Sequence, residues 1–264
     1  MCSIICLTSL LLLTGAETLS VIQPPFVTAV TGKDTVLPCV FNPGDATVKR
    51  RIPHWYFGER INRTDVYPEN NYSSSHHKGR VYMEEEDGNN SISLRILDVH
   101  PGDHNTYYCM MSCIANDFPQ RPTGNGTLLF VHGHLNLSAP MYSLYDQSII
   151  LSCNVTVAKS QHAQLFWMQG TTELSEETSV QSITRLENGM EALQSQLTTD
   201  FPIMPVTYTC VLAYNSQHHI INESVTLNPA EAPVFLYTAV ILKSLLILLI
   251  VLCAIVKERR SSGL

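Results

Sequence analysis

The sequence predicts an all-β protein of two tandem domains, followed by one helix that crosses a membrane. Three observations lead to this prediction. Short segments alternate between apolar and polar residues, as half-buried strands do, and a cysteine, a tryptophan and a Tyr-x-Cys sequence follow one another in that order twice. A long apolar run lies near the end of the chain. The 264 residues leave room for two domains of about 100 residues each.

The first domain is expected over residues 17–132. Its residues 103–109, DHNTYYC, resemble the D-x-G-x-Y-x-C signature of immunoglobulin domains, in which a tyrosine two residues before the second cysteine fixes a corner of the fold. Cys39 and Trp55 precede this segment in the order and spacing of the same family. Residues that alternate toward the core are expected on three strands: Leu37, Cys39 and Phe41; Ile92, Leu94 and Ile96; Tyr107, Cys109 and Met111.

The second domain is expected over residues 133–230, where the same pattern recurs as Cys153, Trp167 and residues 208–210. Fewer residues separate its two cysteines than separate those of the first domain. The resemblance therefore implies two tandem immunoglobulin sandwiches, a variable-type domain and then a constant-type domain.

The chain has eight cysteines. The resemblance assigns four of them to one disulfide in each domain, Cys39–Cys109 and Cys153–Cys210. Three others lie in apolar runs at the two ends of the chain, at positions 2, 6 and 253. Cys113 is left over, either as a free thiol or as a bond between two chains.

The two apolar runs predict a membrane protein of type I topology. Residues 1–16 are typical of a signal peptide, which is too short to span a bilayer. Residues 234–256 would form a helix of about 34 Å, long enough to cross a hydrocarbon core of ~30 Å. Basic residues begin the tail of residues 257–264, which is therefore expected in the cytoplasm. The two domains are then extracellular, at the plasma membrane.

Lys243 lies near the middle of the expected membrane span. A lysine at this depth is costly unless an acidic residue of another membrane helix neutralises it, as in an adapter subunit, or unless its side chain reaches the interface. The tail has no tyrosine, so a receptor of this design would signal through such an adapter. The segment resembles the membrane helices of T-cell receptor chains and of activating paired receptors.

Acceptor sequons for N-glycosylation are spread over both domains, in agreement with a secreted route. They lie at Asn62, Asn71, Asn89, Asn125, Asn136, Asn154 and Asn222.

Several function classes have no residues to support them. The net charge of −7 and the lack of a basic run speak against nucleic-acid binding. No nucleophile elbow, phosphate-binding glycine loop or H-E-x-x-H occurs, so neither an enzyme nor a cofactor is expected. The ten histidines include the pairs 132/134 and 218/219, but neither has the spacing of a metal site, and we expect no metal.

A recognition surface is expected on the sheet of the first domain that carries the tryptophan. Residues that alternate away from the core there are aromatic or sulfur-containing, and the loop over residues 112–122 lies beside them. Such residues, when exposed, are typical of interface cores. The candidate face consists of His54, Tyr56, Tyr108, Met110 and Phe118. Alternatively, a second copy of the chain or glycans cover this face.

Two further segments resemble variable-type domains. Arg80 and Asp103 match the pair that bridges one end of such domains, and the alternative is that both side chains are exposed and unpaired. Residues 124–131, GNGTLLFV, are similar to the last strand of that domain type, where the glycines either permit a bulge or only make a turn.

Residues 27–39, 78–81 and 88–99 are similar to the first domain of butyrophilins and T-cell costimulatory ligands. This resemblance implies a membrane-displayed ligand that binds a counter-receptor on another cell and adjusts T-cell activation, in a stimulatory or inhibitory direction. Lys243 and the short tail favour instead an activating immune receptor that uses an acidic adapter. Homophilic adhesion is a third class that uses the same domains.

Overall fold

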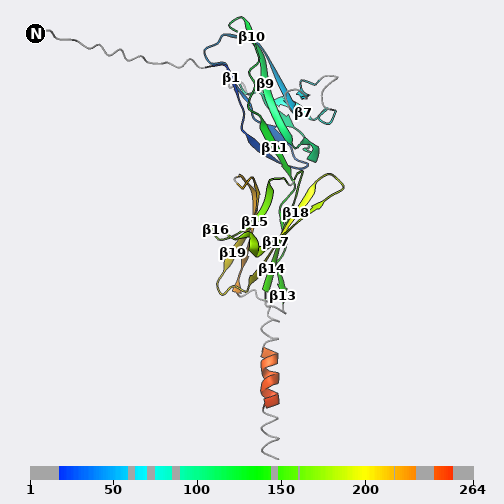
Figure 1. The fold of residues 1–264 in the computed structure, drawn as a ribbon, viewed down its shortest axis with the longest axis vertical. Coiled ribbons are helices and arrows are strands. Elements are labelled where there is room, and N and C mark those ends of the chain that lie inside the picture. The colour runs from blue at the N-terminus through cyan, green and yellow to red at the C-terminus, as the bar shows by residue number, and fades with distance from the viewer. Residues whose placement is uncertain are drawn as a thin grey trace, which may run out of the picture. The chain divides into compact units, whose positions relative to one another are not determined.

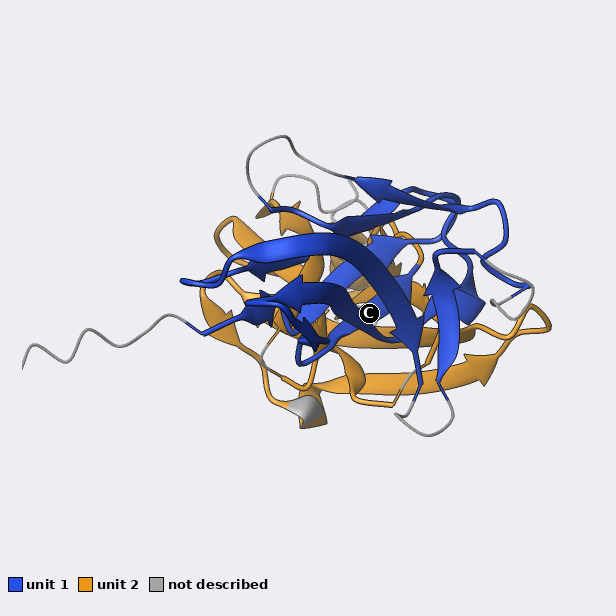
Figure 2. Cartoon of the chain, turned by 90° about the horizontal axis from the view of Figure 1, so that it is seen from above, with its two compact units in different colours: residues 1–132 blue, residues 133–264 orange. Residues whose placement is uncertain are grey.

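The computed structural model is all-β apart from short helical segments (Figure 1). It divides into two compact units, residues 1–132 and residues 133–264 (Figure 2). The structure describes residues 18–58, 63–69, 75–84, 90–143, 148–159, 161–216, 218–229 and 241–251. Several sequence predictions fall outside these residues: the signal peptide 1–16, the tail 257–264, and the sequons Asn62, Asn71 and Asn89.

The first unit has two main β layers. Its strands are β1 (Ser20–Ile22), β2 (Phe26–Val30), β3 (Thr35–Leu37), β4 (Val40–Asn42), β5 (Val48–Phe57), β6 (Thr64–Tyr67), β7 (Val81–Glu84), β8 (Ser93–Ile96), β9 (Asn105–Ala115), β10 (Phe118–Gln120) and β11 (Thr127–His132), with a short 3₁₀ helix, η1 (Pro101–Asp103). One layer has the order β2-β11-β9-β5-β6, with β10 paired to β9. The other consists of β3-β8-β7, and β1 pairs separately with β4. Only the pairing of β2 with β11 is parallel among these ladders.

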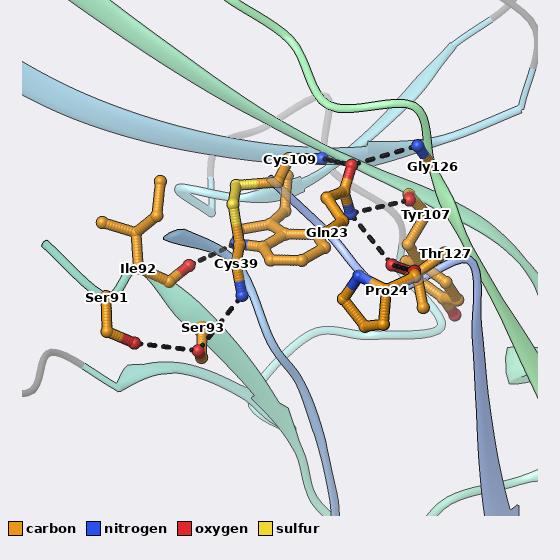
Figure 3. Close-up of a disulfide and its surroundings, with 11 residues drawn as sticks. Gln23, Pro24, Cys39, Ser91, Ile92, Ser93, Tyr107, Cys109, Gly126 and Thr127 are labelled. Atoms are coloured by element: carbon orange, nitrogen blue, oxygen red, sulfur yellow. Dashed lines mark hydrogen bonds between the residues drawn. A yellow bond between two sulfur atoms is a disulfide. The ribbon is translucent and has the colours of Figure 1, made fainter. Parts of the chain in front are cut away.

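The core of the first unit lies between these layers. The residues predicted to alternate inward on β3, β4, β8 and β9 are all buried. A disulfide joins Cys39 to Cys109 (Figure 3). The indole of Trp55 is fully buried and donates its Nε1–H to the carbonyl of Ile92 at 3.0 Å. Burial of the large apolar residues supplies most of the stabilisation, and a disulfide in a small secreted domain adds about 2–5 kcal/mol.

The second unit repeats this plan with fewer strands. These are β12 (Asn136–Leu137), β13 (Met141–Ser143), β14 (Ser148–Val157), β15 (Ala163–Gln169), β16 (Thr172–Glu173), β17 (Ser179–Arg185), β18 (Glu191–Asp200), β19 (Val206–Tyr214) and β20 (His218–Leu227), with the 3₁₀ helix η2 (Glu176–Thr178). One sheet runs β13-β14-β18-β17, with β12 also on β14, and the other runs β16-β15-β19-β20.

A second disulfide, Cys153–Cys210, joins the two sheets of this unit. Trp167 is buried beside β18, and its Nε1–H donates to the hydroxyl of Ser195 at 3.0 Å. Burying an indole requires such an acceptor, because an unpaired N–H away from water is destabilising. The all-β class predicted from the sequence is confirmed.

Residues 241–251 are helical. No helix within the described part of the chain is long and apolar enough to cross a membrane. The rest of the expected span, residues 234–240 and 252–256, lies outside that part.

Candidate functional site

The outer surface of the β5–β9 ladder carries the side chains expected to form a recognition face. Register pairs His54 with Met110, and Tyr56 with Tyr108, across the two strands. The two tyrosine rings stack with their centroids 5.3 Å apart and their planes 17° apart. Because Trp55 and Cys109 alternate with these residues and point into the core, the pairs belong to the opposite side of the sheet.

The expectation that all these side chains are exposed is wrong for two of them. Tyr56 is only 7% exposed and Met110 only 8%. The stacked ring of Tyr108 covers one side of Tyr56, and the guanidinium of Arg63 lies over its ring at 5.3 Å. Met110 is bridged to Thr123, where the chain returns from the β9–β10 hairpin. His54 and Tyr108 are half-buried. Alternation identifies the side of the sheet, but neighbouring chain covers part of that side.

Ile52 of β5 is 51% exposed and lies on this face, because it pairs with Ser112, which faces the same way as Tyr108 and Met110 on β9. Phe118, at the start of β10, is 70% exposed but pairs with Ala115, which faces the same way as Cys109. The expectation that Phe118 belongs to this face is therefore wrong. An open groove of about 670 Å³ runs beside Phe118, between the β9–β10 hairpin and residues 18–19 and 45–46. An exposed aliphatic residue and a partly covered tyrosine pair on one face are typical of the apolar centre of a protein interface.

A second hollow lies directly over the tyrosine stack. It has a volume of about 380 Å³ and is lined by Tyr56, Gly58, Tyr108, Arg121, Thr123 and Gly124. We call it the tyrosine recess. It brings residues of β5, of β9 and of the segment between β10 and β11 together at one point of the face.

The electrostatics of this face are set by two arginines and one carboxylate. Burial lowers the pKa of His54; the charge of Asp65 raises it, and those of Arg63 and Arg121 lower it. His54 is therefore neutral at pH 7. The Nε atom of Arg63 lies 3.7 Å from the Oδ1 atom of Asp65, so this ion pair is loose.

The side-chain amide of Gln23 joins the neighbouring strands β9 and β11 of the same sheet, a role that sequence reasoning missed. Its oxygen accepts the N–H groups of Cys109 at 3.1 Å and Gly126 at 3.2 Å, and its nitrogen donates to Tyr107 and Thr127 (Figure 3). The amide thus replaces a stretch of backbone ladder between β9 and β11.

The two glycines of the predicted last strand are required by close contacts. A Cβ on Gly124 would lie 2.3 Å from the Gln23 oxygen. Gly126 has a φ of +97°, and a Cβ there would lie 2.7 Å from the ring of Tyr108. The close approach of Gln23 and of Tyr108 thus excludes a side chain at either position.

Arg80 and Asp103 form the bridge that the resemblance implies. The guanidinium donates to both carboxylate oxygens, at 2.8 and 3.0 Å, and Asp103 has no exposed surface. Burial by itself raises the pKa of Asp103, but hydrogen bonds from Arg80 and from the His100 N–H outweigh it and leave this pKa below its usual value. The alternative of two exposed, unpaired side chains is excluded.

Histidines surround this bridge. The Nε2 of His76 lies 2.9 Å from Asp103 Oδ1, and the buried His77 places its Nε2 2.9 Å from the hydroxyl of Tyr107. That hydroxyl donates to the backbone carbonyl of Asp103, as in the tyrosine corner of immunoglobulin domains. Burial lowers the pKa of His77 to about 4, against the opposing charge of Asp103.

Three of these groups are close enough to be considered as metal ligands. The ligand atoms of His76, His100 and Asp103 lie within 4.8 Å of one another. Both oxygens of Asp103 already accept hydrogen bonds from Arg80, however, and a cation would be repelled by that guanidinium. We therefore assign the cluster a structural role. Neither histidine pair that lacks the sequence spacing of a metal site, 132/134 or 218/219, belongs to it.

Four of the five cysteines among the described residues form the two disulfides that the resemblance implies, Cys39–Cys109 and Cys153–Cys210. Cys113 is buried on β9 and is in neither bond. Burial raises the pKa of its thiol, although the charge of Arg51 opposes this, so the thiol is protonated and unreactive at neutral pH. These properties fit a free thiol.

Four sequons lie among the described residues. Asn125, Asn136 and Asn222 are exposed, and Asn154 is half-buried. Asn136 and Asn154 face each other directly across the β12–β14 ladder. Their glycosylation stays a prediction, as does the pairing of Lys243, which lies exposed in the helix of residues 241–251.

One comparison with known proteins gives a match. Residues 22–132 match the family model described as the immunoglobulin V-set domain. No curated protein matches the chain. V-set domains are generally non-enzymatic and are typical of extracellular and cell-surface proteins of recognition or adhesion. The chain therefore has an all-β, immunoglobulin-like fold whose first unit is a V-set domain.

Proposed function

We propose that this protein is a cell-surface ligand that binds a counter-receptor on T cells and modulates their activation. The V-set domain supports a role in recognition, and the likeness of residues 27–39, 78–81 and 88–99 to butyrophilins and costimulatory ligands supports the T cell as the partner cell. No cofactor or nucleic acid takes part in this proposal.

The observation that carries the proposal is the outer face of the β5–β9 ladder. It combines a stacked tyrosine pair, a hollow above it, and the exposed side chain of Ile52. Large apolar patches on a soluble domain are destabilising in water unless a partner covers them, and tyrosines and arginines dominate the binding energy of protein interfaces.

We assign the second unit the role of a constant-type spacer. Its sheet orders, β13-β14-β18-β17 and β16-β15-β19-β20, correspond to the ABED and CFG sheets of constant-type domains, with the two-residue β16 added at one edge. Together with the proposed leader and membrane span, this arrangement displays the V-set domain on the plasma membrane as a type I protein.

The test uses cells that display the full chain and primary T cells. We expect T cells to adhere to these cells and to change their cytokine output when their antigen receptor is stimulated at the same time. Ile52→Asp should abolish both effects, because a charge would enter the apolar part of the interface. Val180→Asp is the matched control, since Val180 is 73% exposed but lies on β17 of the second unit. Equal binding by both variants and the unmodified chain would disprove the assignment of the face.

A second function is favoured by Lys243. A lysine in the proposed membrane span would pair with an acidic residue of an adapter, which makes the chain an activating receptor with the opposite direction of signalling. Co-precipitation of acidic adapters with the full chain and with Lys243→Leu separates the two functions. If the full chain captures acidic adapters and Lys243→Leu does not, the receptor function is supported. If neither chain captures them, the ligand function is supported.

A further inference from the structure

The tyrosine recess combines aromatic and cationic side chains, and the proposed function does not say which chemical group of the partner binds there. It is lined by the stacked tyrosines Tyr56 and Tyr108 and by Arg121. Arg121 is exposed, and no ion pair to it occurs among the described residues. The recess thus combines a flat aromatic wall with an available cation.

The charges around the recess are mostly positive. Arg63 lies over the Tyr56 ring at 5.3 Å, and the loosely paired Asp65 is the carboxylate that acts on the neighbouring His54. Two guanidinium groups therefore face one carboxylate on this part of the sheet. The whole chain, in contrast, has a net charge of −7. A local cationic site on an acidic protein favours a partner group of opposite charge.

We infer that the tyrosine recess binds a carboxylate side chain, Asp or Glu, that the partner protein inserts next to Arg121. A guanidinium offers a planar pair of N–H donors that matches the two oxygens of a carboxylate. The tyrosine rings exclude water from one side of this pair, which strengthens it relative to an exposed one. Ile52, on the same face, then contacts an apolar residue of the partner. The inference rests on the proposed function and names the chemistry of its partner.

The first experiment measures adhesion of T cells to cells that display the full chain. We expect Arg121→Glu to weaken adhesion about tenfold or more, since like charges would meet in the interface. Arg121→Lys should weaken it less, because the charge remains but the two-point geometry is lost. Lys159→Glu is the control: it makes the same reversal of charge on an exposed residue of the second unit and should leave adhesion unchanged.

The second experiment does not need the natural partner. A library of disulfide-closed random peptides is selected on cells that display the unmodified full chain, and the selected peptides are then tested on cells with Arg121→Glu. We expect the peptides to be enriched in Asp or Glu and to bind the variant about tenfold more weakly or worse. Peptides without an acidic residue, or with equal binding to both chains, would overturn the inference.

The two experiments fail in different ways. If T cells do not adhere to the unmodified chain while acidic peptides bind at Arg121, the proposed partner cell is wrong and the recess stands. If T cells adhere equally to the unmodified chain and to Arg121→Glu, the ligand function stands and the carboxylate recess is refuted.

Discussion

Asp103→Ala should destabilise the first unit far more than breaking an exposed ion pair of similar length. The guanidinium of Arg80 donates to Asp103 at 2.8 and 3.0 Å, and Lys49 donates to Asp117 at the same 2.8 Å. The two pairs differ in burial: Asp103 has no exposed surface, whereas the side chains of Lys49 and Asp117 are largely exposed.

The magnitude follows from what each variant leaves behind. Removing one partner of a buried ion pair costs about 3–5 kcal/mol. Arg80 keeps the carbonyls of Leu97 and Asp98 as acceptors, each at 3.0 Å, so we expect the lower end of that range, about 3 kcal/mol. Lys49→Ala breaks an exposed pair and should cost about 0–1 kcal/mol.

Urea unfolding of the purified full chain in detergent measures the difference. Trp167→Phe is introduced into every chain, so that fluorescence reports on Trp55 in the first unit. With a slope of about 2 kcal/mol per M, a loss of about 3 kcal/mol lowers the midpoint by about 1.5 M urea. A midpoint for Asp103→Ala within about 0.5 M urea of that for Lys49→Ala would refute the conclusion that burial makes the Arg80–Asp103 pair strong.

Three further predictions concern the same unit. Gln23→Ala removes the acceptor of the Cys109 and Gly126 N–H groups and should lower the free energy of unfolding by about 1–3 kcal/mol in the same assay; no change would mean that water replaces the amide. Cys113 should resist alkylation by iodoacetamide until the chain is unfolded, because its thiol is buried and protonated. On a gel without reductant the chain should run as a monomer. A dimer that Cys113→Ser abolishes would show an interchain disulfide instead. The pKa of His77 falls from 6.5 in the unfolded chain to about 4 in the folded chain, because this side chain is buried. Between these two pH values the unfolded chain binds a proton that the folded chain does not bind. The free energy of unfolding should therefore be highest above pH 6.5 and fall by about 3 kcal/mol toward pH 4. His77→Gln should flatten this decline, and equal pH dependence of both chains would contradict the assignment.

The parts of the fold that the sequence predicts are those with a local signature. Alternation along β8 and β9 identifies which residues face the core, since the side-chain period of a strand is two. The repeated order of cysteine, tryptophan and Tyr-x-Cys implies which sulfurs meet, and the structure has those bonds.

The parts that escape prediction depend on residues far apart in the chain. Gln23 reaches partners 84 to 104 positions away, and nothing in its own neighbourhood distinguishes it from any polar residue before a strand. His77 closes the tyrosine corner from another loop in the same way. Alternation places Tyr56 on the correct side of its sheet but predicts an exposed ring, because it does not indicate that Tyr108 and Arg63 cover this side chain. Arg121 has no signal in the sequence either, because the segment between β10 and β11 has no periodicity that would indicate its neighbours.

Side-chain footprinting in the bound state tests most directly whether the outer face of the β5–β9 ladder is the recognition surface. Cells displaying the full chain are exposed to hydroxyl radicals with and without T-cell membranes, and oxidation of single residues is measured by mass spectrometry. We predict that Ile52, exposed in the free protein, becomes protected by the membranes, while Val180 and Ile183 of β17 stay reactive. Protection of Val180 and Ile183 with unchanged oxidation of Ile52 would place recognition on the second unit and contradict this account.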